Sequence, residues 1–512
     1  RINYSYKDKY LFTGTVRTDG SSRFTPGKQW GTFPSAAFAW KFSKEPFAQG
    51  LTKVLTEGKF RVSYGSVGNN KVGDFSYLSQ FGNLQNSAGY PINNVYVPGM
   101  VPFFYGNDNL TWERSEELDL GLNLNLFKDR VNIEVDYYNR ITKDFLMGVP
   151  LPFYAGYANG TNTQFQNVGR VSNSGVELTI STININSKKF NWTSSFNISF
   201  NQNKILDFYE GFEVRQTAAQ FPSIPTASQP TGWIAVTNQP ISQFFGYVWG
   251  GVYQYTDFDK LANGTYVLKS GIPSYTTPAT TPIQPGDPKY ADINGDGIID
   301  VNDQRVIGRA LPIHTGGLNN NFTYKNWSLN VFLQWSYGND IINANRYIFE
   351  SGSYYINTNQ FATFANRWTP NNPTNEIPRA TFNLRTDVGG QTRISDRIVE
   401  DGSFLRLKTL ALNYSLPANV LKKMKLSNVR FYITVQNLLT ITRYTGLDPE
   451  VSTFRQANPA NAPAGSTGQS NTAGTGFTFI QPSSSYTVLS PGWDYTPYPR
   501  AVTYTIGGSV TF

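Results

Sequence analysis

Apolar and polar residues alternate one by one along much of the chain. Between positions 118 and 126 every even residue is leucine, and the odd residues are aspartate, glycine or asparagine. Successive side chains of a β-strand point to opposite faces, so this segment predicts a strand with one apolar and one polar face. The same alternation resumes from Val131 to Tyr137 after a short turn, which indicates a long hairpin.

Similar alternation recurs through the rest of the chain, whereas helical spacing is almost absent. It predicts an all-β protein. We expect thirteen strands, at about 2–6, 9–17, 33–43, 58–65, 116–126, 130–140, 173–184, 190–200, 314–324, 327–336, 403–415, 428–436 and 500–512.

The connections between these strands alternate between short and long. Unstructured loops beyond ~15 residues are uncommon in compact soluble domains. Outer-membrane β-barrels, in contrast, have short periplasmic turns and long extracellular loops. The alternation therefore predicts a transmembrane antiparallel β-barrel with a periplasmic C-terminus. Its long extracellular loops are expected at about 66–115, 141–172, 201–313, 337–402 and 437–499.

The strand count carries an expectation of its own. Bacterial single-chain barrels have even numbers of strands, and the sequence begins with Arg1 rather than methionine. We therefore expect at least one strand to precede Arg1.

Composition narrows the function classes. Only 15% of the 512 residues are charged and 15% are aromatic, against about 25% charged in a typical soluble domain. With no cysteine and one histidine, disulfide scaffolds, thiolate catalysis and Cys-ligated metal sites are excluded. The net charge of +8 is scattered along the chain, so nucleic-acid binding is not expected. No apolar run approaches the ~18 residues of a membrane-spanning helix.

Several ordered blocks resemble one protein family. The segment Tyr10–Phe24, followed by Trp30–Ser35, is similar to the middle of SusC/RagA-like TonB-dependent outer-membrane transporters. Further blocks similar to the family follow in order: Asn109–Glu113, Asp136–Asn139, Asn167–Gly169, Asn173–Glu177, Asp292–Gly308 and Gln436–Leu438.

This resemblance implies a 22-stranded barrel closed by an N-terminal plug. The thirteen strands would then be the C-terminal part of that barrel, and the plug and early strands would lie outside this chain. The implied function is import of oligosaccharides or, in some members, peptides across the outer membrane. The implied partners are a SusD-like surface lipoprotein, TonB acting through the plug region, and outer-membrane lipid. No catalysis is implied.

One loop motif has the spacing of calcium ligands. Oxygen donors stand at positions 1, 3, 5, 9 and 12 of a loop with glycine at position 6, and position 7 offers a backbone carbonyl. The twelfth position is aspartate instead of the usual chelating glutamate. The alternative is a cluster of Asx turns without metal. The proposed ligands are Asp292, Asn294, Asp296, Ile298, Asp300 and Asp303.

Other candidate sites are weaker. Glu116 with Glu117, and Glu400 with Asp401, are carboxylate pairs, but adjacent strand residues face opposite sides and cannot flank one glycosidic bond. Loop aromatics could stack on sugar rings, pack within the loops or belong to the interfacial girdle. These aromatics are Tyr354, Tyr355, Trp368, Trp493 and Tyr495.

Two alternatives to a glycan importer remain open from the sequence. One is a secreted all-β carbohydrate-binding protein or glycan-active enzyme, which would share aromatic loops and a calcium motif. The other lies within the transporters, namely a peptide or siderophore importer.

Overall fold

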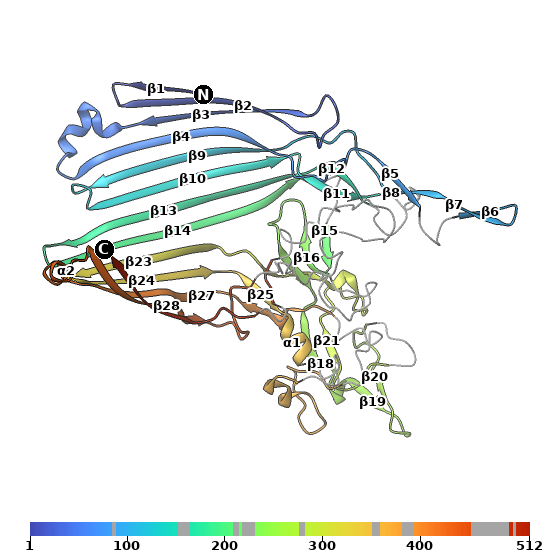
Figure 1. Ribbon diagram of the computed structural model, residues 1–512. Coiled ribbons are helices and arrows are strands. Elements are labelled where there is room, and N and C mark those ends of the chain that lie inside the picture. The colour runs from blue at the N-terminus through green and yellow to red at the C-terminus, as the bar shows by residue number, and fades with distance from the viewer. Residues whose placement is uncertain are drawn as a thin grey trace.

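Thirteen antiparallel strands form one sheet in the computed structural model (Figure 1). The structure describes the chain except residues 84–88, 152–162, 208–213, 218–230, 276–281, 351–358, 381–392, 452–490 and 495–497. Neighbouring strands of the sheet follow one another in the sequence, and within the described residues the first and last strands each pair with one neighbour. The strands are β1 (Ile2–Tyr6), β2 (Tyr10–Gly20), β3 (Trp30–Trp40), β4 (Leu55–Asn69), β9 (Glu113–Leu126), β10 (Val131–Lys143), β13 (Arg170–Asn186), β14 (Phe190–Asp207), β23 (His314–Tyr324), β24 (Trp327–Tyr337), β27 (Phe404–Ser415), β28 (Asn428–Thr442) and β30 (Thr503–Thr511).

All thirteen predicted strands are confirmed, and the all-β fold class with them. The largest differences lie where a strand continues past its period-two pattern. In β28 the alternation stops at Gln436, yet the strand continues to Thr442. Asn437 has a φ of 54°, and the pairing with β27 shifts register opposite it, between Leu407 and Thr409. Such a bulge changes the face to which the next side chains point, so it ends the sequence pattern without ending the strand.

The register gives the sheet two unlike faces. One row of paired residues crosses β9, β10, β13 and β14 as Leu122, Val135, Leu178 and Ile198. The next row across the same strands is Asn123, Glu134, Thr179 and Asn197. Apolar and polar residues therefore occupy opposite faces across neighbouring strands, as a barrel wall between lipid and a polar lumen requires.

Connections of different length lie at opposite ends of the sheet (Figure 1). The short turns share one end with the 3₁₀-helices η1 (Phe42–Lys44) and η2 (Pro46–Leu51) and with helix α2 (Ala418–Met424). The long connections lie at the other end. They contain β5 (Gln80–Asn83), β6 (Gly89–Ile92), β7 (Val95–Pro98), β8 (Met100–Phe104), β11 (Leu146–Pro150), β12 (Thr163–Asn167), β15 (Val214–Thr217), β16 (Thr231–Ala235), β17 (Gln243–Gly246), β18 (Trp249–Val252), η6 (Tyr255–Asp257), β19 (Phe258–Lys260), β20 (Tyr266–Leu268), β21 (Pro288–Tyr290), η7 (Val301–Asp303), β22 (Arg305–Arg309), β25 (Asp340–Asn343), α1 (Ala344–Phe349), η8 (Ala362–Asn366), η9 (Asp396–Ile398), β26 (Val399–Asp401) and β29 (Trp493–Asp494).

The last three long connections share a hydrophobic core. Trp233 and Phe244 from the β14–β23 connection pack with Ile342 and Tyr347 from the β24–β27 connection and with Trp493 from the β28–β30 connection. Strand β25 pairs antiparallel with β26 and parallel with β29. These connections therefore form one folded unit, which we call the loop unit. In the described part of the chain, no helix has the length and apolar character needed to cross a bilayer.

Candidate functional site

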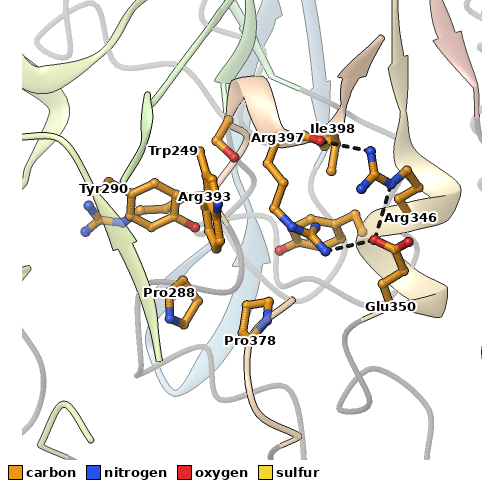
Figure 2. A pocket seen from close by; sticks show the side chains of 11 residues that line it. Trp249, Pro288, Tyr290, Arg346, Glu350, Pro378, Arg393, Arg397 and Ile398 are labelled. Carbon is orange, nitrogen blue, oxygen red and sulfur yellow. Dashed lines mark hydrogen bonds and ion pairs between the residues drawn. The ribbon is translucent and has the colours of Figure 1, made fainter. Parts of the chain in front are cut away.

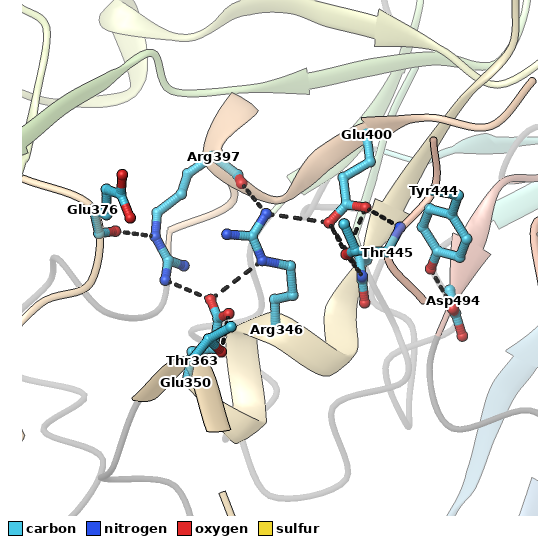
Figure 3. Close-up of polar contacts among 10 residues, drawn as sticks. Arg346, Glu350, Thr363, Glu376, Arg397, Glu400, Tyr444, Thr445 and Asp494 are labelled. Carbon is cyan, nitrogen blue, oxygen red and sulfur yellow. Dashed lines mark hydrogen bonds and ion pairs between the residues drawn. The ribbon is translucent and has the colours of Figure 1, made fainter. Parts of the chain in front are cut away.

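A buried carboxylate holds part of the loop unit together. Glu350 follows helix α1 and is only 3% exposed. It accepts hydrogen bonds from Arg346 Nε at 3.2 Å, Arg397 Nη2 at 2.8 Å and Thr363 Oγ1 at 2.8 Å (Figure 3). Arg346 lies one helical turn before Glu350, so α1 itself brings the two together. Two guanidinium groups therefore share one buried carboxylate.

A second carboxylate joins two of the long connections. Glu400 accepts a hydrogen bond from Arg346 Nη1 at 3.1 Å. On its other side it accepts one from the backbone N–H of Thr445 at 2.8 Å. Thr445 belongs to the β28–β30 connection, whereas Arg346 and Glu400 belong to the β24–β27 connection. The network thus fixes one connection against the other (Figure 3).

Of the two arginines, Arg397 has the less favourable electrostatic environment. Burial lowers its pKa below the ordinary arginine value, and the nearby Glu350 opposes that shift. Its guanidinium also lies 5.4 Å from the ring centroid of Trp249. A buried cation that shares its main counter-ion with a second cation is poorly compensated.

A small pocket opens beside these arginines (Figure 2). Its lining includes Trp249, Arg346, Glu350, Arg393 and Arg397. The cavity volume is about 40 Å³, whereas pockets that enclose a whole small molecule measure about 300–1,000 Å³. The pocket can therefore take one chemical group, but not a whole sugar ring or peptide.

The polar face of the sheet carries its own charge cluster. Arg61 Nη2 contacts Asp136 at 2.6 Å and Glu134 at 2.8 Å. Nearby, Arg140 contacts Glu117 at 2.5 Å, whereas the adjacent Glu116 contacts Lys143 at 2.8 Å. Adjacent glutamates thus enter separate ion pairs, which agrees with their reading as strand charges and not as a glycosidase pair.

In the predicted calcium loop, residues 292–303, aspartate side chains accept hydrogen bonds from the loop's own backbone. Asp292 accepts backbone hydrogen bonds from Gly295 at 2.7 Å and Gly297 at 2.8 Å. The fully buried Asp303 accepts from Ile293 at 2.7 Å and from Asp300 at 2.8 Å. Within the described residues, no three His, Cys, Asp or Glu side chains stand where they could hold one metal ion. The geometry is that of an Asx-turn cluster, and calcium binding stays a prediction.

That prediction can be tested on Asp296. Its carboxylate receives only local bonds, from the backbone of Ile298 at 2.8 Å and the side chain of Asn294 at 2.9 Å. If the loop binds calcium, Asp296→Ala should remove about one bound calcium per full-length chain, measured by elemental analysis after dialysis against calcium. Unchanged calcium content in the variant would contradict calcium binding by this loop.

The aromatic candidates divide into two groups. Trp368 and Trp493 are buried, at 5% and 3% exposed, so both pack within the loop unit and neither offers a face for sugar stacking. Tyr354, Tyr355 and Tyr495 lie outside the described residues.

Asp494 beside Trp493 is buried at 2% exposed and accepts a hydrogen bond from Tyr444 Oη (Figure 3). Burial raises the pKa of Asp494, and the Tyr444 hydrogen bond only partly offsets it. A raised folded-state pKa contributes stability that is complete below the unfolded value of about 3.9 and is lost as pH rises through the folded value. The ionised form of Asp494 thus weakens this part of the loop unit at neutral pH.

Asp494→Asn should accordingly stabilise the β25–β29 pairing at pH 7. The amide keeps an acceptor for Tyr444 and removes the buried charge. We expect slower hydrogen exchange of the Ile342 amide, which donates to Gly492 O at 2.8 Å, and we expect this advantage to vanish near pH 4. An equal advantage at both pH values would show that the charge is not the cause.

Sequence reasoning did not identify the arginine network. The spacing of Arg346 and Glu350 would suit a helical ion pair, but helix α1 lies in a stretch without clear periodicity. Arg397 reaches Glu350 from 47 residues away, and no local pattern reports such a contact.

Comparison with known proteins gives consistent matches. A family model described as "TonB dependent receptor-like, beta-barrel" matches residues 1–438. "TonB-dependent receptor P3" of Formosa agariphila is 35% identical over 512 residues, covering 100% of this chain and 45% of the relative. "TonB-dependent receptor SusC" of Bacteroides thetaiotaomicron is 30% identical over 464 residues, covering 90% of this chain and 42% of the relative.

Among solved structures, the RagAB peptide transporter superposes with a TM-score of 0.71 at 23% identity, covering 100% of this chain and 47% of that one. This likeness shows a shared fold. The chain spans less than half the length of these relatives.

Proposed function

Because this chain belongs to the TonB-dependent receptor family of outer-membrane β-barrel transporters, we propose that it imports oligosaccharides together with a SusD-like surface lipoprotein. The family consists of transporters and not of enzymes, which favours import over the secreted-enzyme alternative. The observation that carries the proposal is the 30% identity to SusC over 90% of the chain.

The proposed arrangement follows the two faces of the sheet. The row that contains Leu122 and Leu178 faces lipid, and the row that contains Glu134 and Thr179 faces the lumen. The thirteen strands form the C-terminal part of a 22-stranded barrel, whose plug and remaining strands belong to the rest of the protein. The long connections face the outside of the cell, and the C-terminus faces the periplasm.

Transport in this arrangement needs no covalent step. The polar face, which we assign to the lumen, carries paired charges such as Arg61 with Asp136. The loop unit is held by buried ion pairs and a hydrophobic core, so it presents a preformed surface to the lipoprotein and the substrate. TonB supplies the pull that displaces the plug.

Peptide import is the second candidate. The solved structure with a TM-score of 0.71 is described as a peptide transporter. At 23% identity, this likeness shows a shared fold and does not indicate the substrate. The two candidates differ in the nutrient that the cell loses when the transporter is deleted.

A deletion strain tests the proposal. We expect it to lose growth on a defined oligosaccharide as sole carbon source and to keep growth on peptides, and we expect the tagged full-length protein to co-purify with a surface lipoprotein. Growth lost only on peptides would favour the second candidate. Unchanged growth on every oligosaccharide and peptide, with no lipoprotein recovered, would contradict both.

A further inference from the structure

We propose that the arginine pocket of the loop unit binds the carboxylate of a uronic-acid residue in the imported oligosaccharide. This inference rests on the proposed function and specifies its substrate class. The arginine pocket is defined by Trp249, Arg346, Glu350, Arg393 and Arg397.

The first argument is the set of donors that remain unused. Arg346 donates a hydrogen bond from Nε to Glu350, and its Nη1 donates to Glu400 and to the Arg397 carbonyl. Arg397 donates a hydrogen bond from Nε to the Glu376 carbonyl and one from Nη2 to Glu350. Within the described part of the chain, Arg346 Nη2 and Arg397 Nη1 have no hydrogen-bond partner. Two guanidinium groups thus each retain one N–H donor nitrogen beside the same cavity.

The second argument is charge. The lining includes the guanidinium groups of Arg346 and Arg397 and a single carboxylate, Glu350, which the two share. Arg393 also lines the pocket, but its guanidinium lies over the rings of Tyr247 and Tyr275. Three more carboxylate residues stand near but do not line the pocket. Glu400 is bound by Thr445, Asp396 by the backbone N–H of Trp249, and the exposed Glu376 meets Arg397 through its backbone carbonyl. Burial disfavours the positive charge of Arg397. A bound monoanion would offset part of that charge. A dianion would meet stronger repulsion from Glu350.

The third argument is size and shape. At about 40 Å³ the cavity exceeds the volume needed for one water, roughly 10–15 Å³, and suits a planar carboxylate. Guanidinium nitrogens match that group in geometry, since arginine forms short charge-assisted bonds with carboxylate oxygens. The ring that bears the carboxylate would stay outside, beside the half-buried indole of Trp249, which offers the apolar surface that sugar rings contact.

The test is calorimetric titration of the full-length transporter in detergent with two matched trisaccharides, one ending in glucuronate and one ending in glucose. We expect the glucuronate form to bind at least about tenfold more tightly, the contribution of one charge-assisted hydrogen bond. Arg346→Lys and Arg397→Lys keep the positive charges that pair with Glu350 but lose the planar set of guanidinium N–H donors. Each variant should reduce the preference for the glucuronate trisaccharide several-fold. Arg500→Lys, a half-exposed loop arginine at 42%, should leave it unchanged.

Equal affinity for the two trisaccharides would overturn the inference, as would a preference that survives in both pocket variants. An acidic tripeptide that binds as tightly as the glucuronate trisaccharide, and loses affinity in the same variants, would overturn the assignment to a sugar. Import of neutral oligosaccharides without any uronate preference would refute this inference alone, whereas no oligosaccharide import at all would refute the proposed function.

Discussion

Arg406→Met is expected to open the last long connection of the chain locally. Arg406 lies on β27 and is 2% exposed. Its Nη2 contacts Asp448 at 2.5 Å and its Nη1 contacts Glu450 at 2.7 Å. Methionine fills a similar space but leaves Asp448, 11% exposed, without its cationic partner. Removing one member of a buried ion pair costs about 3–5 kcal/mol.

Hydrogen exchange of the full-length protein measures this cost where it arises. Exchange of the amides between Tyr444 and Glu450 should accelerate by about a hundredfold or more, because each 1.4 kcal/mol is about a factor of ten. Arg500→Met removes a half-exposed partner of the same Glu450 and should change exchange only by about fivefold or less. Equal acceleration in the two variants would show that burial of Arg406 is not what matters.

The same ion pair predicts a response to acid. Burial raises the pKa of Asp448, but hydrogen bonds from the Glu450 amide and from Arg406 outweigh it, so the pKa lies below its ordinary value. A depressed folded-state pKa gives stability that is present above the unfolded value of about 3.9 and is lost as pH falls through the folded value. Protection factors in this segment, which correct for the slower intrinsic exchange in acid, should therefore fall at acid pH in the wild type and change less in Arg406→Met.

Leu178→Arg is expected to weaken membrane insertion, whereas Thr179→Arg is not. The two residues are neighbours on β13 and point to opposite faces. Leu178 pairs with Val135 and Ile198 in the apolar row, and Thr179 pairs with Glu134 and Asn197 in the polar row. An arginine on the lipid face near the bilayer midplane costs about 2–4 kcal/mol, while at Thr179 it would meet the Glu134 carboxylate.

The free energy of unfolding of the full-length protein in lipid vesicles, from denaturant titration, compares the pair directly. We expect a loss of about 2–4 kcal/mol for Leu178→Arg and little change for Thr179→Arg. If Thr179→Arg is the more damaging of the two, the assignment of the faces is reversed.

The sequence predicts the sheet well because each strand shows its two faces in its own alternation of apolar and polar residues. Strand β9 shows its two faces in its own alternation of leucine with polar residues, and β23 was predicted to its observed bounds, His314–Tyr324. No contact beyond the neighbouring strands is needed to read such a pattern. Where a bulge interrupts the period, as at Asn437, the alternation stops and the predicted strand ends too early.

The loop unit could not be predicted in the same way. Trp233 and Trp493 have ring centroids 5.3 Å apart, although about half the chain separates them. Arg397 and Glu350 likewise meet only through the fold of the connections. Contacts of this kind depend on tertiary packing, which leaves no period in the sequence. The sequence pattern therefore predicts only loops in the long connections and gives no sign of their shared core or of the arginine pocket.

Uptake of a labelled oligosaccharide by intact cells shows whether the full-length protein is a TonB-dependent importer. Cells with the full-length transporter should accumulate the label in the periplasm, and cells that lack TonB should bind it at the surface without accumulating it. Leu178→Arg should reduce uptake in proportion to the protein lost from the outer membrane. Accumulation that is equal with and without the transporter, or that persists at the same rate without TonB, would contradict TonB-dependent import by this protein.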